Sequence, residues 1–410
     1  MLREYQFKQL KRLLYHAYEN VPYYRKIFKE RNMKPEDIKS IEDLSKLPVL
    51  DKDTFRKHFK DFIARNINVK NIFLTHTSGT TGKPLQFYQT YDENIIEWAF
   101  ICFQWSRVGY RPGEKRVEIR GPIINKKKPA IYRPLDKVLR LSPVIKDKET
   151  VEFYIKTIKS FGARYLHGYP SAIATFANMI KKYEFRIPFK LNAIFFSSEE
   201  VYDWEREIVE EVFNCRVFSH YGLTEHVALA AECEKSSFYH FVPQYGIVEM
   251  DPKTREIIAT GFLNYVNPFI RYRTTDVVLS PISYGCEYCG RQFPIVRKIE
   301  GRIEDFIITP SGTIIPPAVI THPFKDLKTI KNTQLVQDDY DHMILRVELY
   351  DKPCEESDKE IKQLVEELSA IMNFEIKIEV EIVDEIERTP TGKFKWIVSN
   401  ISRQRKIFPE

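Results

Sequence analysis

The stretch IFLTHTSGTTGKP, residues 72–84, joins a short apolar run to a loop that is rich in hydroxyls and glycines and carries one lysine. Glycine lets backbone N–H groups come close to anionic oxygens, hydroxyl groups add donors, and the lysine supplies a compact positive charge. The loop therefore has the chemistry to bind the β- and γ-phosphates of ATP. The residues predicted to bind them are Thr77, Ser78, Gly79, Thr80, Thr81, Gly82 and Lys83.

A Walker P-loop does not fit this stretch. Only two residues separate Gly79 from Gly82 where that motif needs four, and Pro84 follows the lysine where Ser or Thr should ligate Mg²⁺. P-loop kinases and GTPases are thereby disfavoured. A plain polar surface turn is the alternative interpretation of such a cluster.

Outside this loop, short apolar runs alternate with helical patterns from about residue 70 to residue 300. Alternation of this kind is typical of an α/β fold. The apolar runs lie at 71–74, 193–196 and 216–219, and the helical patterns lie at 149–161 and 171–182.

The two ends of the chain follow other patterns. Apolar residues recur at helical spacing from Phe7 to Ala17, which predicts an amphipathic first helix that ends near Pro22. Towards the other end, a helix pattern over 361–368 precedes a strict apolar alternation from Phe374 to Ile382, which predicts a half-buried strand. A small α+β domain is therefore expected to close the chain.

Composition limits the classes of function. The 410 residues suggest more than one domain, and 63 basic against 57 acidic residues, well interspersed, do not indicate nucleic-acid binding. No stretch approaches the ~20 apolar residues of a membrane span, and the N-terminus lacks a signal-peptide core, so a cytoplasmic location is expected. Six cysteines are too few for a disulfide scaffold.

Four residues are predicted to bind a metal. Cys286 and Cys289 form a CxxC knuckle, and Cys233 and His240 lie a short loop apart upstream. Tetrahedral Zn²⁺ accepts a Cys₃His set, and four protein ligands leave no open position, so the prediction is structural zinc. A redox CxxC is the alternative, although it usually opens a helix in a thioredoxin-like unit.

Four further segments stand in the order expected of the adenylate-forming (acyl-CoA synthetase-like) superfamily, which the chain resembles from about residue 70 to 395. The fold implied is a large N-terminal α/β domain, residues 1–303, with a small mobile C-terminal α+β domain, residues 304–410. The segments are YGLTE at 221–225, IRYRTTD at 270–276, GRIED at 301–305 and RTPTGK at 388–393.

The resemblance implies a nucleotide site built from the first two segments and the phosphate loop. Tyr221 would stack on adenine, with Gly222 in the same segment, while Thr224 would contact a phosphate or carboxylate oxygen and Glu225 would help hold Mg²⁺. Asp276 would bind both ribose hydroxyls, a bidentate task suited to a carboxylate. Thr275 replaces the usual glycine of this motif.

The last two segments imply the hinge and the catalytic residue. Arg302 would reach the nucleotide, and Glu304 would be the hinge, where Asp is common. Lys393 would catalyse adenylation. When a carboxylate attacks the α-phosphorus of ATP, negative charge builds on phosphoryl and bridging oxygens, and a preorganised cation stabilises it.

Within the superfamily, the chain most resembles phenylacetate-CoA ligase-like and CapK-like proteins, through its opening helix with the continuation YENVPYY at 18–24 and through CEYCGR at 286–291. The acid would lie near Tyr169, Pro170 and Phe196, and adenine near Ser198 and Glu199, where SSEE at 197–200 replaces a GAEP-like sequence.

The function implied is ATP-dependent activation of a carboxylic acid, aryl or similarly apolar, to an acyl-adenylate, followed by transfer to CoA. The alternatives are an amine, hydroxyl or sugar acceptor in a polysaccharide or cofactor pathway, AMP transfer itself, and a nucleotide-binding scaffold without chemistry. The expected cofactors are ATP/AMP, Mg²⁺, CoA and structural Zn²⁺. A homodimer is compatible with the sequence, which does not decide the oligomeric state.

Overall fold

The structure is a computed structural model that describes residues 1–67, 69–77, 85–121, 130–278, 280–302, 305–325, 327–389 and 391–401. The chain divides into two compact units, each made of two segments that are distant in sequence. Unit 1 comprises Met1–Arg107 and His220–Ile299, and unit 2 comprises Val108–Ser219 and Glu300–Glu410. The boundary predicted between residues 303 and 304 separates two domains that move relative to each other, which differs from a division by compactness, so it stays a prediction.

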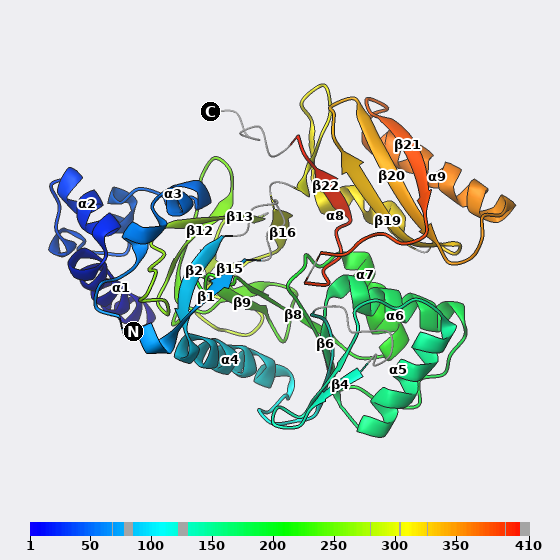
Figure 1. Cartoon of the computed structure of the whole chain (residues 1–410), viewed down its shortest axis with the longest axis horizontal. Helices are drawn as coiled ribbons and strands as arrows, with labels where there is room; N and C mark the ends of the chain where they lie inside the picture. The colour runs from blue at the N-terminus through cyan, green and yellow to red at the C-terminus, as the bar shows by residue number, and fades with distance from the viewer. Residues whose placement is uncertain are drawn as a thin grey trace. The chain divides into compact units, whose positions relative to one another are not determined.

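Unit 1 packs helices against antiparallel strands, which Figure 1 shows in blue to cyan for the first segment and in green to yellow for the second. Its helices are α1 (Leu2–Asn20), α2 (Pro22–Glu30), α3 (Lys52–Lys57) and α4 (Tyr91–Trp105). Its strands are β1 (Ile72–His76), β2 (Gln86–Thr90), β9 (Leu229–Glu232), β10 (Tyr239–Phe241), β11 (Gly246–Met250), β12 (Glu256–Gly261), β13 (Tyr272–Val278), β14 (Ser283–Tyr284) and β15 (Pro294–Val296). The chain passes between the units within β8 (Val217–Gly222) and within β16 (Ile299–Arg302).

The predicted first helix is confirmed. Helix α1 buries Leu10, Leu13, Leu14 and Ala17, and these side chains join a core that includes Phe269 of the distant second segment. The amphipathic stripe therefore packs on the body of unit 1, as stripes of this kind usually do.

Unit 2 contains a mostly parallel sheet and a smaller mixed sheet. In the first, β5, β3, β6 and β7 pair in parallel and β4 is antiparallel at the edge. In the second, the strand order is β21-β20-β19-β22. The strands are β3 (Arg116–Ile119), β4 (Ala130–Arg133), β5 (Val138–Leu141), β6 (Tyr165–Gly168), β7 (Ala193–Ser197), β17 (Ile307–Ile308), β18 (Ile314–Ile315), β19 (Ile330–Gln337), β20 (His342–Leu349), β21 (Lys377–Val383) and β22 (Ile397–Ser399).

The helices of unit 2 are α5 (Lys148–Phe161), α6 (Pro170–Lys182), α7 (Asp203–Phe213), α8 (Pro317–Ile320) and α9 (Glu355–Ile371). Helices α5, α6 and α7 lie side by side, and α9 packs along the second sheet (Figure 1). The α/β pattern before residue 300 and the α+β pattern after it are thereby confirmed. None of the described helices combines the length and the apolar character that crossing a bilayer requires.

The strand expected over 374–382 differs from the structure. Strand β21 begins at Lys377, whereas Phe374 adopts φ +58° and is 75% exposed. Val380 and Ile382 are also exposed. The prediction of a half-buried strand was wrong because β21 is an edge strand, and strict alternation does not say how much of an edge the neighbouring helix covers.

Candidate active site

Three parallel strands of unit 2 end side by side, and one polar or aromatic residue follows each of them. Arg120 follows β3, Tyr169 follows β6, and Ser198 follows β7. In open α/β sheets, ligands bind outside the carboxyl ends of the strands. Tyr169, predicted to lie near the acid, and Ser198, predicted to lie near adenine, therefore share this carboxyl edge, and their roles stay predictions.

A buried hydrogen-bond network crosses the edge. His167 Nε2 lies 2.9 Å from Arg120 Nη1 and 2.9 Å from Ser197 Oγ, and Arg120 Nη2 donates to Ser198 Oγ at 3.1 Å. Burial, and next the charge of Arg120, lower the pKa of His167 to about 4. The imidazole is therefore neutral at physiological pH, and Nε2 accepts the hydrogen bond from the guanidinium.

The loop that carries Lys393 docks on the same edge. Tyr169 donates its hydroxyl to the carbonyl oxygen of Thr391 at 2.8 Å. Gly392 has φ +81°, and a Cβ atom on it would lie 2.2 Å from the carbonyl oxygen of Gly121. Only glycine fits this approach, so the loop position depends on Gly392. The half-buried Lys393 follows directly.

Glu199 fastens this loop. Its Oε1 accepts from the backbone N–H of Phe394 at 2.8 Å, and its Oε2 accepts from the backbone N–H of Ser171 at 3.2 Å in the first turn of α6. Burial raises the pKa of Glu199, although the charge of Arg388 and these hydrogen bonds lower it in part. The carboxylate thus joins the lysine-bearing segment to the strand edge, a role that the sequence did not suggest.

Two predicted substrate residues of unit 2 are buried. Pro170 starts α6, and Phe196 has no exposed surface and belongs to the apolar core. Contact of Phe196 with the acid stays a prediction.

Arg302 ends β16 in unit 2, and Glu304 lies outside the described residues.

Unit 1 brings together Tyr221 and Asp276, two of the residues that were predicted to bind adenosine, whereas Ser198, Glu199 and Arg302 belong to unit 2. Tyr221 donates its hydroxyl to Asp276 Oδ2 at 2.6 Å, and Tyr272 donates to Glu225 Oε1 at 2.7 Å. Burial, and next the charge of Asp276, raise the pKa of Tyr221 well above its ordinary value. Thr275 adopts φ +72°, the left-handed region that favours glycine, at the position where it replaces the glycine of the motif.

The turn that carries Thr224 and Glu225 is held from β2 and α4. Gln89 Nε2 donates to the carbonyl oxygen of Thr224 at 2.6 Å, and the buried His226 contacts Glu97 Oε2 at 2.7 Å. Burial lowers the pKa of His226, but hydrogen bonds to Glu93 and Glu97 have the larger opposite effect and raise the pKa to about 9. These supporting residues were missed, although Glu93 and Glu97 share one face of a helical pattern.

The base of the predicted phosphate loop is closed in unit 1. The backbone N–H of Thr77 donates to the carbonyl oxygen of Leu85 at 2.9 Å, and Thr77 Oγ1 accepts from the Leu85 N–H at 3.0 Å. Gly222 and Thr224 are exposed at the end of β8. The loop predictions for Ser78, Gly79, Thr80, Thr81, Gly82 and Lys83 lie outside the described residues.

The four predicted zinc ligands converge. Their ligand atoms all lie within 4.8 Å of one another, with 3.9 Å between the sulfurs of Cys233 and Cys286 and 3.9 Å between Cys289 Sγ and His240 Nε2. Tetrahedral Zn²⁺ with Zn–S bonds of about 2.3 Å needs sulfurs roughly 3.8 Å apart. The donor set and its spacing therefore fit zinc, and its convergence, which was predicted from the sequence, is confirmed.

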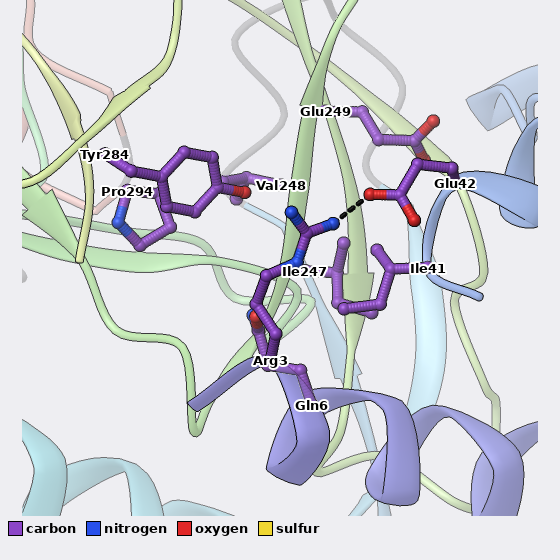
Figure 2. A pocket seen from close by; sticks show the side chains of 9 residues that line it. All are labelled: Arg3, Gln6, Ile41, Glu42, Ile247, Val248, Glu249, Tyr284 and Pro294. Carbon is purple, nitrogen blue, oxygen red and sulfur yellow. Dashed lines mark hydrogen bonds and ion pairs between the residues drawn. The ribbon is translucent and has the colours of Figure 1, made fainter. Parts of the chain in front are cut away.

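A cavity of about 310 Å³ elsewhere in unit 1 contains none of the predicted site residues. Arg3, Glu42 and Tyr284 are among the residues that line it, and Figure 2 shows the ion pair between Arg3 and Glu42. Because the arginine already has a carboxylate partner, this cavity offers less binding chemistry than the strand edge.

The chain is similar to several known proteins. Residues 307–400 match the family model of the CapK C-terminal domain. The chain is 27% identical over 395 residues to protein CapK of Staphylococcus aureus, covering 93% of this chain and 86% of that protein. It is 26% identical over 423 residues to the phenylacetate-coenzyme A ligase of Pseudomonas putida, covering 99% and 88%.

Among solved structures, the fold matches 2-hydroxyisobutyryl-CoA ligase in the postadenylation state in complex with 2-HIB-AMP, with a TM-score of 0.73, 18% identity, and coverage of 98% of this chain and 90% of that chain. The chain is therefore a relative of CapK and the phenylacetate-CoA ligases, and it has the fold of the adenylate-forming CoA ligases.

Proposed function

We propose that the protein is an ATP-dependent ligase that activates a carboxylic acid and transfers its acyl group to CoA. The acid carboxylate attacks the α-phosphorus of ATP and pyrophosphate leaves, which forms an acyl-adenylate. The CoA thiol then attacks the acyl carbon, its proton is lost, and AMP leaves as the thioester forms. The observation that carries the proposal is the docking of the Lys393 loop on the carboxyl edge of β3, β6 and β7.

Lys393 stabilises the charge that develops in the first step. The hydrogen bonds that Tyr169 and Glu199 make to backbone atoms of its loop hold that loop at the strand edge before the reaction begins. A cation fixed in place needs little reorganisation in the transition state, which is the main source of electrostatic catalysis. Mg²⁺ would neutralise phosphate charge, and the buried Glu225 is the carboxylate that would hold it.

Tyr221 and Asp276 form the adenosine side. Their 2.6 Å hydrogen bond fixes the ring of Tyr221 for stacking, and Asp276 binds both ribose hydroxyls in this proposal. In this proposal, residues 304–410 form a domain that moves about a hinge at Glu304.

A second candidate acceptor follows from the CapK similarity. The family match covers 307–400, the region that would supply the acceptor side, and it is to CapK rather than to the ligases. In this variant, an amine, hydroxyl or sugar replaces CoA in the second step.

ATP–pyrophosphate exchange with a panel of aryl and aliphatic acids tests the first step, and consumption of CoA thiol tests the second. Acid-dependent exchange with thiol loss is expected. Exchange without thiol loss would favour the alternative acceptor, and no exchange with any acid would refute adenylate formation.

We also propose that Cys233, His240, Cys286 and Cys289 hold structural zinc. Three thiolates leave the complex with one net negative charge, and the buried guanidinium of Arg107 has no hydrogen-bond partner among the described residues. Its positive charge would offset the charge of the complex.

A further inference from the structure

Arg120 is an arginine at the acid site whose described partners are all neutral. Its guanidinium donates to His167 Nε2, to Ser197 Oγ and to Ser198 Oγ, at 2.9–3.1 Å. Among the residues that the structure describes, it makes no ion pair. A half-buried cation is stable when an anion pairs with it, whereas Glu118 acts on Arg120 only through space and forms its ion pairs with other arginines.

The two neighbouring arginines already share the nearby carboxylate. Glu118 binds Arg116 at 3.1 Å and Arg140 at 3.2 Å, and it is 5% exposed. His167 is neutral, so it adds no charge. Arg116 starts β3, Arg140 lies on β5, and Arg120 follows the carboxyl end of β3. All three arginines act on Glu118, and Arg120 is the one that an incoming anion would neutralise.

The position of Arg120 links it to the reaction. Its guanidinium lies 5.7 Å from the centre of the Tyr169 ring, and the hydroxyl of the same tyrosine holds the Lys393 loop. An acid whose reacting carboxylate faces Lys393 would extend along Tyr169 towards Arg120.

We propose that the acid which this enzyme activates carries a second carboxylate, and that Arg120 binds it. This inference rests on the proposed adenylation function and defines its substrate class. Arg120 would hold the second carboxylate through charge-assisted hydrogen bonds, with Ser197 and Ser198 orienting the guanidinium. The acid can still be aromatic, since only its second carboxylate needs to reach Arg120. A phosphate oxygen of ATP has the same anionic chemistry and is the competing source.

The test compares acids in matched pairs by ATP–pyrophosphate exchange: phenylacetate with carboxyphenylacetates, and butyrate with glutarate. We expect kcat/KM to be about ten- to a hundredfold higher for the better diacid of a pair than for its monoacid, the range for one charge-assisted hydrogen bond. Equal or better use of the monoacids would overturn this inference and leave the proposed function standing. Absence of exchange with every acid would overturn both.

Variants then identify the residue. In Arg120→Met, the preference should fall to about one while the KM for ATP changes less than about threefold, and Arg120→Lys should restore part of the preference. Arg346→Met, which removes an exposed arginine of β20, is the matched control and should keep the preference. A raised KM for ATP with an unchanged preference would assign Arg120 to the nucleotide and overturn the inference. If Arg120→Met does not fold, Ser198→Ala, which removes one acceptor of the guanidinium, should still weaken the preference for diacids. An unchanged preference in Ser198→Ala would then overturn the inference.

Discussion

Replacing Gly392 by alanine should uncouple the Lys393 loop from the strand edge. The added methyl group would lie 2.2 Å from the carbonyl oxygen of Gly121, whereas real Cβ contacts essentially never fall below 3.0 Å. The loop must therefore move away by about 0.8 Å or more. Because both atoms at the contact belong to rigid groups, side-chain rotation cannot relieve the overlap.

The size of the effect follows from this displacement. Misplacing a catalytic group by about 1 Å costs on the order of a hundredfold in rate. Alanine at φ +81° adds backbone strain of about 1–2 kcal/mol, which opposes the docked loop further. We expect Gly392→Ala to lower acid-dependent ATP–pyrophosphate exchange about a hundredfold or more, and to affect thioester formation from supplied acyl-adenylate much less.

Gly312→Ala is a control that adds the backbone strain of alanine at positive φ without a steric clash. Gly312 has φ +88°, but a Cβ atom on it would meet nothing within 4 Å. This control should lose a little stability and keep its exchange rate. Exchange in Gly392→Ala at the rate of the Gly312→Ala control would refute docking of the loop at this edge.

Three other outcomes are expected. Lys393→Ala should lower pyrophosphate exchange about a hundred- to a thousandfold while ATP binding measured by calorimetry persists, and unchanged exchange would remove its catalytic role. Protein purified without chelator should contain about one zinc per chain; Cys286→Ser should lose it and unfold at lower temperature, whereas Cys354→Ser, an exposed thiol outside the cluster, should not. Glu118→Gln should cost about 3–5 kcal/mol of unfolding free energy, because it leaves buried arginines without their shared partner. Burial raises the pKa of Glu118, but the hydrogen bond with His167 and the charge of Arg116 lower the pKa far more. The contribution of Glu118 to the stability of the folded protein is therefore present above pH 4.5 and is lost as the pH falls. Urea titrations at pH 7 and pH 4 should therefore show a smaller difference between wild type and Glu118→Gln at the lower pH, and an equal difference would contradict this.

Local patterns predicted much of the fold. Apolar spacing predicted α1, α5, α6 and α9, since a helix that packs on a core must repeat its apolar residues about every 3.6 positions. The prediction for the strand over 374–382 was wrong about where the strand begins and how far it is buried, since cover by a neighbouring helix is a tertiary property.

The candidate site divides along the same line. The resemblance to the adenylate-forming superfamily named Tyr221 and Asp276, and the placement of cysteines and a histidine named the four zinc ligands. The fold brings together each of these two sets. The roles of Arg120 and Glu199 could not be predicted, since their partners are distant in sequence and no periodic pattern connects them.

The sequence by itself determined the α/β class, the order of the motifs and the identity of the residues that carry charge, because these depend on local spacing and side-chain chemistry. Only the tertiary structure decided which charges are neutralised and which backbone atoms touch. Those depend on distances between segments that lie side by side in space and far apart along the chain, as at Gly121 and Gly392.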